Sequence, residues 1–254
     1  MIMATKMFLA SVSHVKSPIV PYYKPHYILE SFWDLRGGSH KKDEFIRWCL
    51  SADMFLLDSG AFAAMNKARK TDTFSEDSVD KYVEEYIAFI NKWNIEYFFE
   101  LDIDKIIGYD RVLEIRRRIE EGTGKKCIPV WHLSRGIENF HKMCKEYNYV
   151  AIGGMAAKEF SKEDKTMIPE LCRIAHDYGC KIHGLGYMPL SMLEAGDSMF
   201  DSVDGTSWEG HMRGQNFKVV DGKITKFKDD RHWKEVAYDC FGFWHKYSYI
   251  MDGD

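Results

Sequence analysis

Short apolar segments alternate with amphipathic segments along most of the chain. The apolar segments are typical of β-strands buried on both faces, and the intervening segments carry apolar residues at helical spacing. Ser78–Trp93 is the clearest example, with valine, tyrosine and isoleucine along one stripe. The predicted strands are Met7–Ser13, Met54–Asp58, Tyr97–Ile103, Cys127–Leu133, Tyr149–Met155, Lys181–Tyr187 and Met199–Val203. Strands that alternate with helices in this way predict a parallel sheet built from βαβ units.

The predicted helices complete a repeating strand–helix pattern. They are Asp43–Leu50, Ser78–Trp93, Tyr109–Glu121, Ile137–Glu146, Lys162–Tyr178 and a short one near Pro189–Ala195. Seven strand–helix repeats in 254 residues favour a closed (β/α)8 TIM-type barrel over an open sheet, although no eighth strand is evident. Beyond them, Phe217–Phe227 predicts a hairpin about Asp221-Gly222, and His232–Tyr247 a terminal helix. We find no linker or repeat, so residues 1–254 are expected to form a single domain.

One long stretch, His14–His40, has no clear pattern. It contains Pro18, Pro21 and Pro25 and many aromatic residues. A loop of this length within a compact domain is usually functional. Its aromatic side chains can either cover a ligand or pack on the mouth of the barrel.

Charge and cysteine usage restrict the possible partners and the compartment. The formal net charge of −4 provides no global attraction to nucleic acid, so a polynucleotide would need a local basic patch. The six cysteines form no CxxC pair, the amino terminus is not a convincing signal peptide, and no apolar run is long enough to span a bilayer. We therefore expect a cytoplasmic protein with reduced thiols and no membrane association.

Three apolar strands are predicted to end in aspartate: Asp58, then Asp102 with Asp104, and then Asp201. A carboxylate in a strand is costly unless it is paired or used. The ends of other strands carry His132, Gly153-Gly154, and Gly184 with Gly186. In parallel barrels the carboxyl ends of the strands form one rim, where the active site lies. The alternative is that each aspartate only caps the following turn or helix.

Carboxylates on one rim suit chemistry at an acetal-like carbon. One can attack and form a covalent intermediate while another moves protons. At an N-glycosidic bond this is base removal or base exchange. The same pattern can also serve a sugar hydrolase or a metal site.

Several motifs occur in an order that resembles the guanine transglycosylases. They are Asp58-Ser-Gly-Ala-Phe62, Leu101-Asp102, Ala151-Ile-Gly-Gly-Met-Ala156, His183-Gly-Leu-Gly186, Met199-Phe-Asp-Ser-Val203 and Arg213-Gly-Gln-Asn-Phe217. The resemblance implies a (β/α)8 barrel that exchanges guanine for a 7-deazaguanine base such as preQ0.

The resemblance also implies roles for individual residues. Asp201 matches the nucleophile, Asp58 the general acid/base, and Asp102 the carboxylate that reads the base. Gly154, beside Gly153, matches a backbone contact to the base. His132 lies near a glutamine of the family, and His183 takes the place of an apolar side chain under the ring, where it either stacks or is structural. Asp104 and Gly184 complete the expected base-binding set.

The chain also departs from the family. The tRNA enzymes carry a Cys3His zinc site, but this chain has only Cys240 in that region, with His232 and His245. We therefore expect no metal and no cofactor. The short zinc-free pattern resembles the DNA-guanine transglycosylases of phages and bacterial modification islands, which implies DNA as the polymer. The first candidates for phosphate contacts are Lys67, Arg69, Lys70 and Arg213, and the alternative for each is an ordinary surface residue.

Other functions remain open from the sequence. They are the same exchange on tRNA, an N-glycosidase or nucleoside deoxyribosyltransferase on the same barrel, and an inactive barrel that serves as a binding subunit. The tyrosine-rich composition permits a homodimer or a partner subunit but requires neither.

Overall fold

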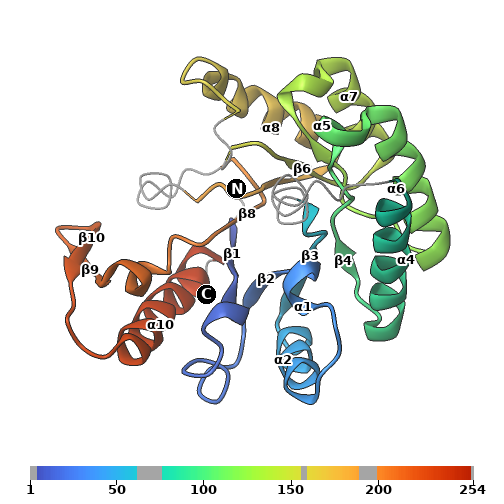
Figure 1. Cartoon of the computed structure of the whole chain (residues 1–254). Coiled ribbons are helices and arrows are strands. Elements are labelled where there is room, and N and C mark those ends of the chain that lie inside the picture. The colour runs from blue at the N-terminus through green and yellow to red at the C-terminus, as the bar shows by residue number, and fades with distance from the viewer. Residues whose placement is uncertain (1–4, 62–75, 156–158, 189–198, 253–254) are drawn as a thin grey trace.

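The computed structural model describes residues 5–61, 76–155, 159–188 and 199–252 (Figure 1). Eight of its strands form one parallel sheet in the order β4-β3-β2-β1-β8-β7-β6-β5. They are β1 (Lys6–Ala10), β2 (Tyr27–Ser31), β3 (Met54–Asp58), β4 (Tyr97–Phe98), β5 (Val130–Trp131), β6 (Tyr149–Ile152), β7 (Lys181–Gly184) and β8 (Ser202–Gly205).

The sheet curls until its two outer strands meet. Phe99, directly after β4, forms a parallel bridge with Ile128, two residues before β5. The Ile128 N–H donates to the carbonyl of Phe98 at 2.8 Å, and the Glu100 N–H donates to the carbonyl of Ile128 at 3.0 Å. The parallel α/β architecture is therefore TIM-barrel-like, as the strand–helix pattern predicted.

Helices cover the outside of this sheet (Figure 1). The α-helices are α1 (Phe32–Leu35), α2 (His40–Leu50), α4 (Glu76–Trp93), α5 (Asp104–Ile107), α6 (Tyr109–Thr123), α7 (Ile137–Glu146), α8 (Ile168–Asp177) and α10 (Trp233–Asp252). Short 3-10 turns are η1 (Val12–His14), η2 (Leu133–Arg135), η3 (Asp164–Met167) and η4 (Gly210–Arg213). The antiparallel hairpin β9 (Gln215–Val220) and β10 (Lys223–Lys228) precedes α10.

One position departs from a strict strand–helix alternation. Residues 11–26, between β1 and β2, contain only the three-residue η1 and no α-helix. The terminal helix α10 instead packs against β1. The Trp244 and Phe241 side chains of α10 are fully buried. The C-terminal helix therefore completes the helical layer next to β1, the first strand.

Successive residues along each strand point to opposite faces of the sheet and so contribute to two separate hydrophobic cores. Inward-facing residues such as Phe8, Leu29, Leu56 and Val130 form a cluster inside the curled sheet. Their neighbours, such as Leu57, pack outward beneath the helices. Both faces of each strand are buried, which explains why the strands read as continuous apolar runs.

The structure corrects two predictions about strands. The missing eighth strand is β2, which lies inside the stretch His14–His40 that was expected to be an irregular loop. The last barrel strand is Ser202–Gly205 and begins three residues later than predicted. The short helix predicted near Pro189–Ala195 lies outside the described residues. Within the described residues, no helix is both long and apolar enough to cross a membrane.

Candidate active site

Asp58 is the last residue of β3 and faces the interior of the curled sheet. Its Oδ2 accepts the Gly60 N–H at 2.9 Å, which closes a turn directly after the strand. Burial and the neighbouring charges of Asp102 and Asp204 raise the pKa of Asp58 to about 7, against an opposing contribution from the Gly60 N–H. Asp58 is therefore a carboxyl group that can both donate and accept a proton near neutral pH.

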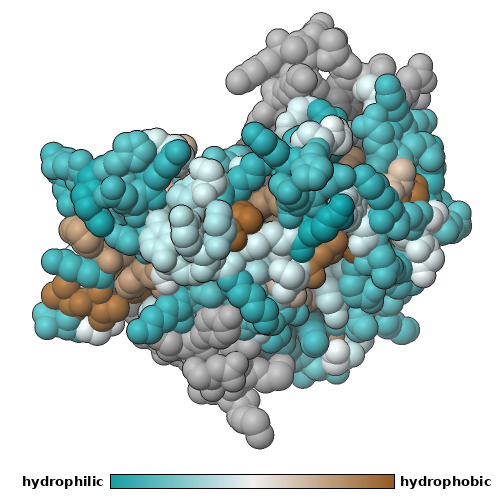
Figure 2. Space-filling model, turned by 90° about the horizontal axis from the view of Figure 1, so that it is seen from below, coloured by the Kyte–Doolittle hydropathy of each residue, from teal (hydrophilic) through white to brown (hydrophobic). Residues whose placement is uncertain are grey.

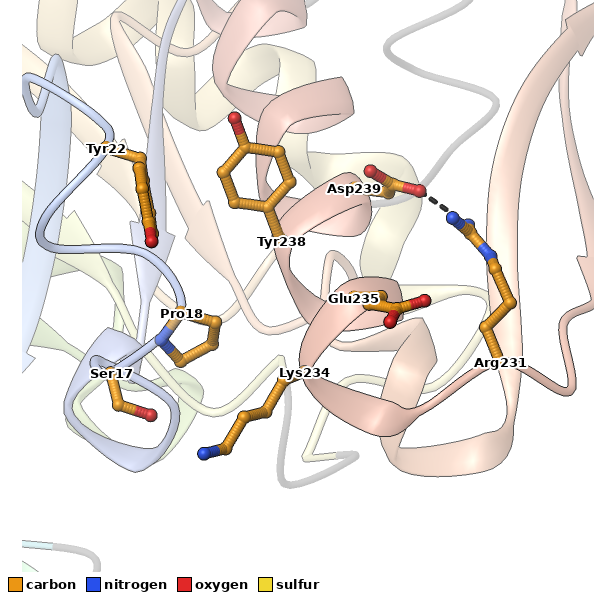
Figure 3. A pocket seen from close by; sticks show the side chains of 8 residues that line it. All are labelled: Ser17, Pro18, Tyr22, Arg231, Lys234, Glu235, Tyr238 and Asp239. Atoms are coloured by element: carbon orange, nitrogen blue, oxygen red, sulfur yellow. Dashed lines mark hydrogen bonds and ion pairs between the residues drawn. The ribbon is translucent and has the colours of Figure 1, made fainter.

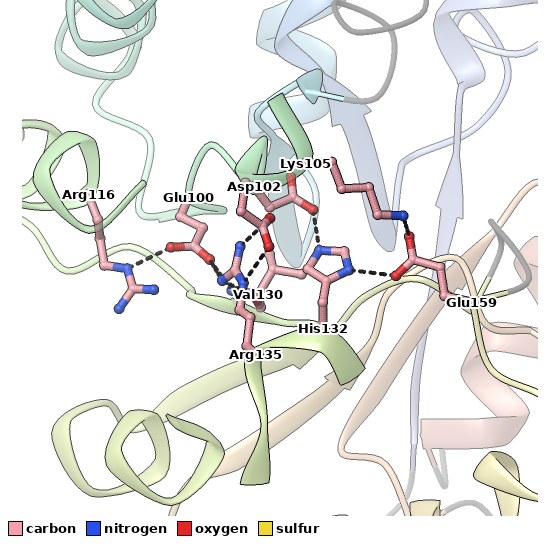
Figure 4. Close-up of polar contacts among 9 residues, drawn as sticks. Glu100, Asp102, Lys105, Arg116, Val130, His132, Arg135 and Glu159 are labelled. Atoms are coloured by element: carbon pink, nitrogen blue, oxygen red, sulfur yellow. Dashed lines mark hydrogen bonds and ion pairs between the residues drawn. The ribbon is translucent and has the colours of Figure 1, made fainter. Parts of the chain in front are cut away.

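Asp102 follows β4 and is held by His132, which follows β5. His132 Nε2 lies 3.0 Å from Asp102 Oδ2, and His132 Nδ1 lies 3.2 Å from Glu159 Oε2 (Figure 4). Both ring nitrogens therefore face carboxylates, an arrangement that favours the imidazolium form of the ring. Burial lowers the pKa of His132, but its interactions with Asp102 and neighbouring acids raise it above the usual value. Lys105 forms an ion pair with Glu159 and extends this charged chain.

Asp204 lies on β8 and faces inward, beside a buried chain of hydrogen bonds. His183 Nε2 lies 3.1 Å from Asp204 Oδ1, and His183 Nδ1 lies 2.6 Å from Ser202 Oγ. The Tyr149 hydroxyl lies 2.5 Å from Ser202 Oγ. Burial raises the pKa of Tyr149, so its hydroxyl keeps its proton. One proton order that satisfies the whole chain runs from Tyr149 to Ser202, from Ser202 to His183, and from His183 to Asp204.

One oxygen of Asp204 and one of Asp102 remain available. Asp204 Oδ1 also accepts the Gly186 N–H at 2.6 Å, but Oδ2 accepts no hydrogen bond from any described residue. Asp102 Oδ1 likewise has no described donor. The site therefore presents two free carboxylate oxygens together with Asp58, whose carboxyl group can gain or lose a proton near neutral pH.

The structure does not bring Asp201 to this group. Asp201 precedes β8, and its backbone bonds to Lys6 and Ile182, which lie at the beginnings of β1 and β7. Its Oδ2 accepts the Ile182 N–H at 2.7 Å and lies 3.0 Å from His176 Nε2 on α8. Asp201 is thus at the amino-terminal end of the strand and on the outer face, so the expectation that it is the nucleophile is wrong.

Asp104 is also occupied elsewhere. Arg135 binds both of its oxygens, with Nη2–Oδ1 at 2.9 Å and Nε–Oδ2 at 3.3 Å. Arg135 Nη1 lies 2.6 Å from Glu100 Oε1, while Arg116 Nε lies 2.6 Å from Glu100 Oε2 (Figure 4). Glu100 is fully buried and also accepts the Val130 N–H. This network fixes β4 to β5 beneath Asp102 and leaves Asp104 in a structural role instead of the expected base contact.

The glycines of the predicted rim have different surroundings. A Cβ on Gly153 would lie 2.6 Å from Val130 Cγ1 and 2.8 Å from His132 Cε1, so glycine leaves room for the imidazole. Gly154 has a positive φ of 81° and borders Glu159 in the same way. Gly184 faces the Phe200 and Tyr187 side chains on the outer layer and does not face the acids. His183 is fully buried and bonds to Asp204. Of the two roles expected for it, it therefore has the structural one and does not stack on a base.

Two aromatic residues of the expected loop, Phe32 and Tyr23, pack against other aromatic side chains. Phe32 is buried against Tyr82 and Tyr86. Tyr23 packs on Tyr238 and Phe241 of α10. A hollow of about 550 Å3 lies between this segment and α10 (Figure 3), lined by Ser17, Pro18, Tyr22, Arg231, Lys234, Glu235, Tyr238 and Asp239. It contains none of the rim aspartates.

The remaining predictions concern nucleic acid and metal. Arg213 is exposed at the end of η4, near the carboxyl end of β8. Lys67, Arg69 and Lys70 lie outside the described residues. Within the described residues, no three histidine, cysteine, aspartate or glutamate side chains are grouped closely enough to hold a metal ion.

Sequence reasoning missed Asp204, Glu159 and the arginines that fix the acids. Asp204 was visible as the second aspartate of Asp201-Ser-Val-Asp204, and only the register of β8 decides between them. Arg116 belongs to the run Arg116-Arg117-Arg118 on α6, yet it is buried against Glu100 while Arg117 is exposed. Nothing in its local sequence distinguishes it from Arg117.

Comparisons with known proteins give little further information. No protein-family model matches the chain, and no curated protein sequence matches it. Among solved structures it is similar to the protein CitE from Mycobacterium tuberculosis, whose crystal structure is in complex with magnesium, acetoacetate and coenzyme A. The similarity covers 100% of both chains, with 8% sequence identity and a TM-score of 0.40. A similarity this low does not bear on the chemistry of the present chain.

Proposed function

We propose that this chain is a base-exchange transglycosylase that replaces guanine in DNA with a 7-deazaguanine base, with Asp204 as the attacking carboxylate. The observation that carries the proposal is that Asp58 and Asp204 both face the interior of the curled sheet, where burial and the charges of Asp102 and Asp204 raise the pKa of Asp58 to about 7. The order of sequence motifs that resembles the guanine transglycosylases supports the choice of base and polymer. The attacking role passes from Asp201 to Asp204, three residues later in the same motif.

The first half of the reaction breaks the glycosidic bond. The free Oδ2 of Asp204 attacks C1′ of the nucleotide, and the bond from C1′ to N9 of guanine breaks. Asp58 gives its proton to N9, so guanine leaves as the neutral base and Asp58 becomes a carboxylate. The sugar remains joined to Asp204 through an ester.

The second half reverses these steps with another base. The incoming 7-deazaguanine loses the proton of its ring nitrogen to Asp58, and that nitrogen attacks C1′. The ester to Asp204 breaks, and its carboxylate is restored. Two displacements at C1′ retain the configuration of the sugar.

Asp102 suits recognition of the base. Its free Oδ1 can accept hydrogen bonds from the N–H groups of a guanine-like edge, while Oδ2 stays on His132. A base that lacks those N–H groups would leave Asp102 Oδ1 without a donor.

The proposal is tested by incubating the protein with 8-14C-guanine-labelled oligonucleotide DNA and unlabelled preQ0. We expect labelled guanine to be released only when preQ0 is present. Release without preQ0 would instead indicate a hydrolytic N-glycosidase. Labelled tRNA in a parallel reaction separates the two polymers, and Asp58→Asn and Asp102→Asn are expected to abolish release from DNA. No release from either polymer would contradict the proposal.

A further inference from the structure

The hairpin of β9 and β10, together with Arg213 before it, carries a cluster of positive charges. Residues 213–228 contain one acidic residue, Asp221, and the basic residues Arg213, Lys218, Lys223, Lys226 and Lys228. The chain as a whole has a net charge of −4. Lys228 pairs with Asp230 at 3.1 Å. Within the described residues, none of the other four cations has a carboxylate partner, so this hairpin is a cationic surface on an acidic protein.

The two faces of the hairpin differ. On one face, Phe217 and Ile224 are buried, and the Phe217 ring packs against Trp244 of α10 at 5.3 Å. Residues on the other face point into solvent: Lys218, Val220, Lys223 and Phe227. The Lys218 ammonium lies 5.3 Å from the centre of the Phe227 ring. Along the left edge of Figure 2, the side on which Figure 1 places the hairpin, hydrophobic residues lie among hydrophilic ones.

The hairpin, η4 and the segment after β8 together form a hollow of about 430 Å3. It is lined by Thr206, Ser207, Glu209, Gly210, Met212, Arg213, Gln215 and Lys226. Thr206 and Ser207 belong to the segment that directly follows β8, the strand that carries Asp204. Arg213 and Lys226 bring two positive charges to the hollow. Glu209 brings one negative charge, and its Oε1 lies 3.7 Å from His14 Nδ1. Two cations with nearby hydroxyl groups are the chemistry that binds a phosphodiester.

We propose that this hairpin is the DNA-binding surface of the protein. A backbone phosphate binds in the hollow at Arg213 and Lys226, and the outer face offers Lys218 and Lys223 to further phosphates. The exposed edge of Phe227 provides an apolar surface for a base. The choice of DNA as the occupant rests on the proposed function, and the positive charge of the hairpin supports a polyanion independently.

The test measures binding of fluorescent DNA by anisotropy between 50 and 200 mM salt. The triple variant Lys218→Gln/Lys223→Gln/Lys226→Gln should lower the affinity at least about tenfold. It should also reduce the slope of log K against log salt by about 2 to 3, since each lost phosphate contact removes about 0.9 on duplex DNA and about 0.7 on a single strand. The matched control is Lys142→Gln/Lys145→Gln, two exposed lysines on α7. It should retain the affinity and slope of the original protein.

Several results would overturn the inference. They are an unchanged slope in the hairpin variant, an equal loss in the α7 control, no binding of DNA by the original protein, and tighter binding of RNA of the same sequence. Thermal unfolding of both variants checks that each is folded. Binding is measured without exchange, so a protein that binds DNA through the hairpin but exchanges no base would contradict the proposed function alone.

Discussion

His183 Nε2 lies 3.1 Å from Asp204 Oδ1, inside the curled sheet and out of contact with solvent. The other ring nitrogen lies 2.6 Å from Ser202 Oγ. Both ring nitrogens of His183 thus have buried partners, which fix the orientation of the ring. His183 is therefore a positioning residue that directs one oxygen of Asp204 and leaves the other free.

Removing this donor is expected to lower kcat more than it changes KM. In His183→Leu, Asp204 keeps only the Gly186 N–H on Oδ1. Its carboxylate is then less well positioned for attack on C1′, whereas Asp102, which is proposed to read the base, keeps its contacts. His183→Gln, which keeps a side-chain donor, should restore part of kcat. A His183→Leu protein with unchanged kcat would contradict the positioning role, and a loss of activity that His183→Gln does not reverse would indicate a purely structural role.

Asp58 should make the folded state less stable as the pH rises. Its pKa is raised from the ordinary value of 3.8 to about 7, so between these values the folded state binds more protons than the unfolded state. Stability should therefore fall across this window, by at most about 1.4 kcal/mol per pH unit. Burial also raises the pKa of Glu30 to about 7, with the same sign.

The comparison of the original protein with Asp58→Asn isolates the contribution of Asp58. Asparagine keeps an oxygen for the Gly60 N–H and removes the titration. Urea unfolding from pH 4 to pH 8 should give a shallower decline for the variant, with Glu30 unchanged in both. Parallel curves would mean that Asp58 has an ordinary pKa.

The buried ion pairs at Glu100 should be essential to stability. Arg116→Met leaves one side of the fully buried Glu100 carboxylate unpaired. Breaking a buried pair costs about 3–5 kcal/mol. Arg117→Met alters the adjacent, exposed arginine and should change the free energy of unfolding by less than about 0.5 kcal/mol. Equal effects in urea unfolding would show that Arg116 is solvated like its neighbour.

Gly153→Ala should disturb His132 directly. The added methyl group would contact Val130 Cγ1 at 2.6 Å and His132 Cε1 at 2.8 Å. Overpacking of this kind costs about 1–3 kcal/mol, and displacement of the imidazole should weaken its bond to Asp102 and reduce exchange. Gly38→Ala, where nothing lies within 4 Å of the added atom, serves as the control and should behave like the original protein. A fully active Gly153→Ala protein would argue against a role for His132.

The helices were the most predictable part of the fold. Ile137–Glu146 is found with the predicted bounds, and α6 begins at Tyr109 as predicted, because the apolar stripe marks each helix. The strand β2 escaped prediction for two physical reasons. Prolines precede it, and Glu30 interrupts its apolar pattern although it is fully buried with the Ser13 N–H on Oε1.

The position of the acidic residues depends on the register of β8, which the apolar run in the sequence does not specify. Val203 packs outward and Asp204 inward, so Asp201, which shares the parity of Val203, also points outward. Met199 and Phe200 extend the apolar run but precede the strand, and Phe200 packs on Tyr187. Asp58 and Asp102 were predicted correctly as rim residues because each directly follows a short apolar run.

The most direct test of the site is to look for the covalent intermediate. The protein is incubated with labelled DNA, quenched, and examined on a denaturing gel for DNA joined to protein, followed by mass spectrometry of the labelled peptide. The site described here predicts an adduct at Asp204 that is absent in Asp204→Asn and still forms in Asp201→Asn. An adduct that persists in Asp204→Asn and disappears in Asp201→Asn would contradict it.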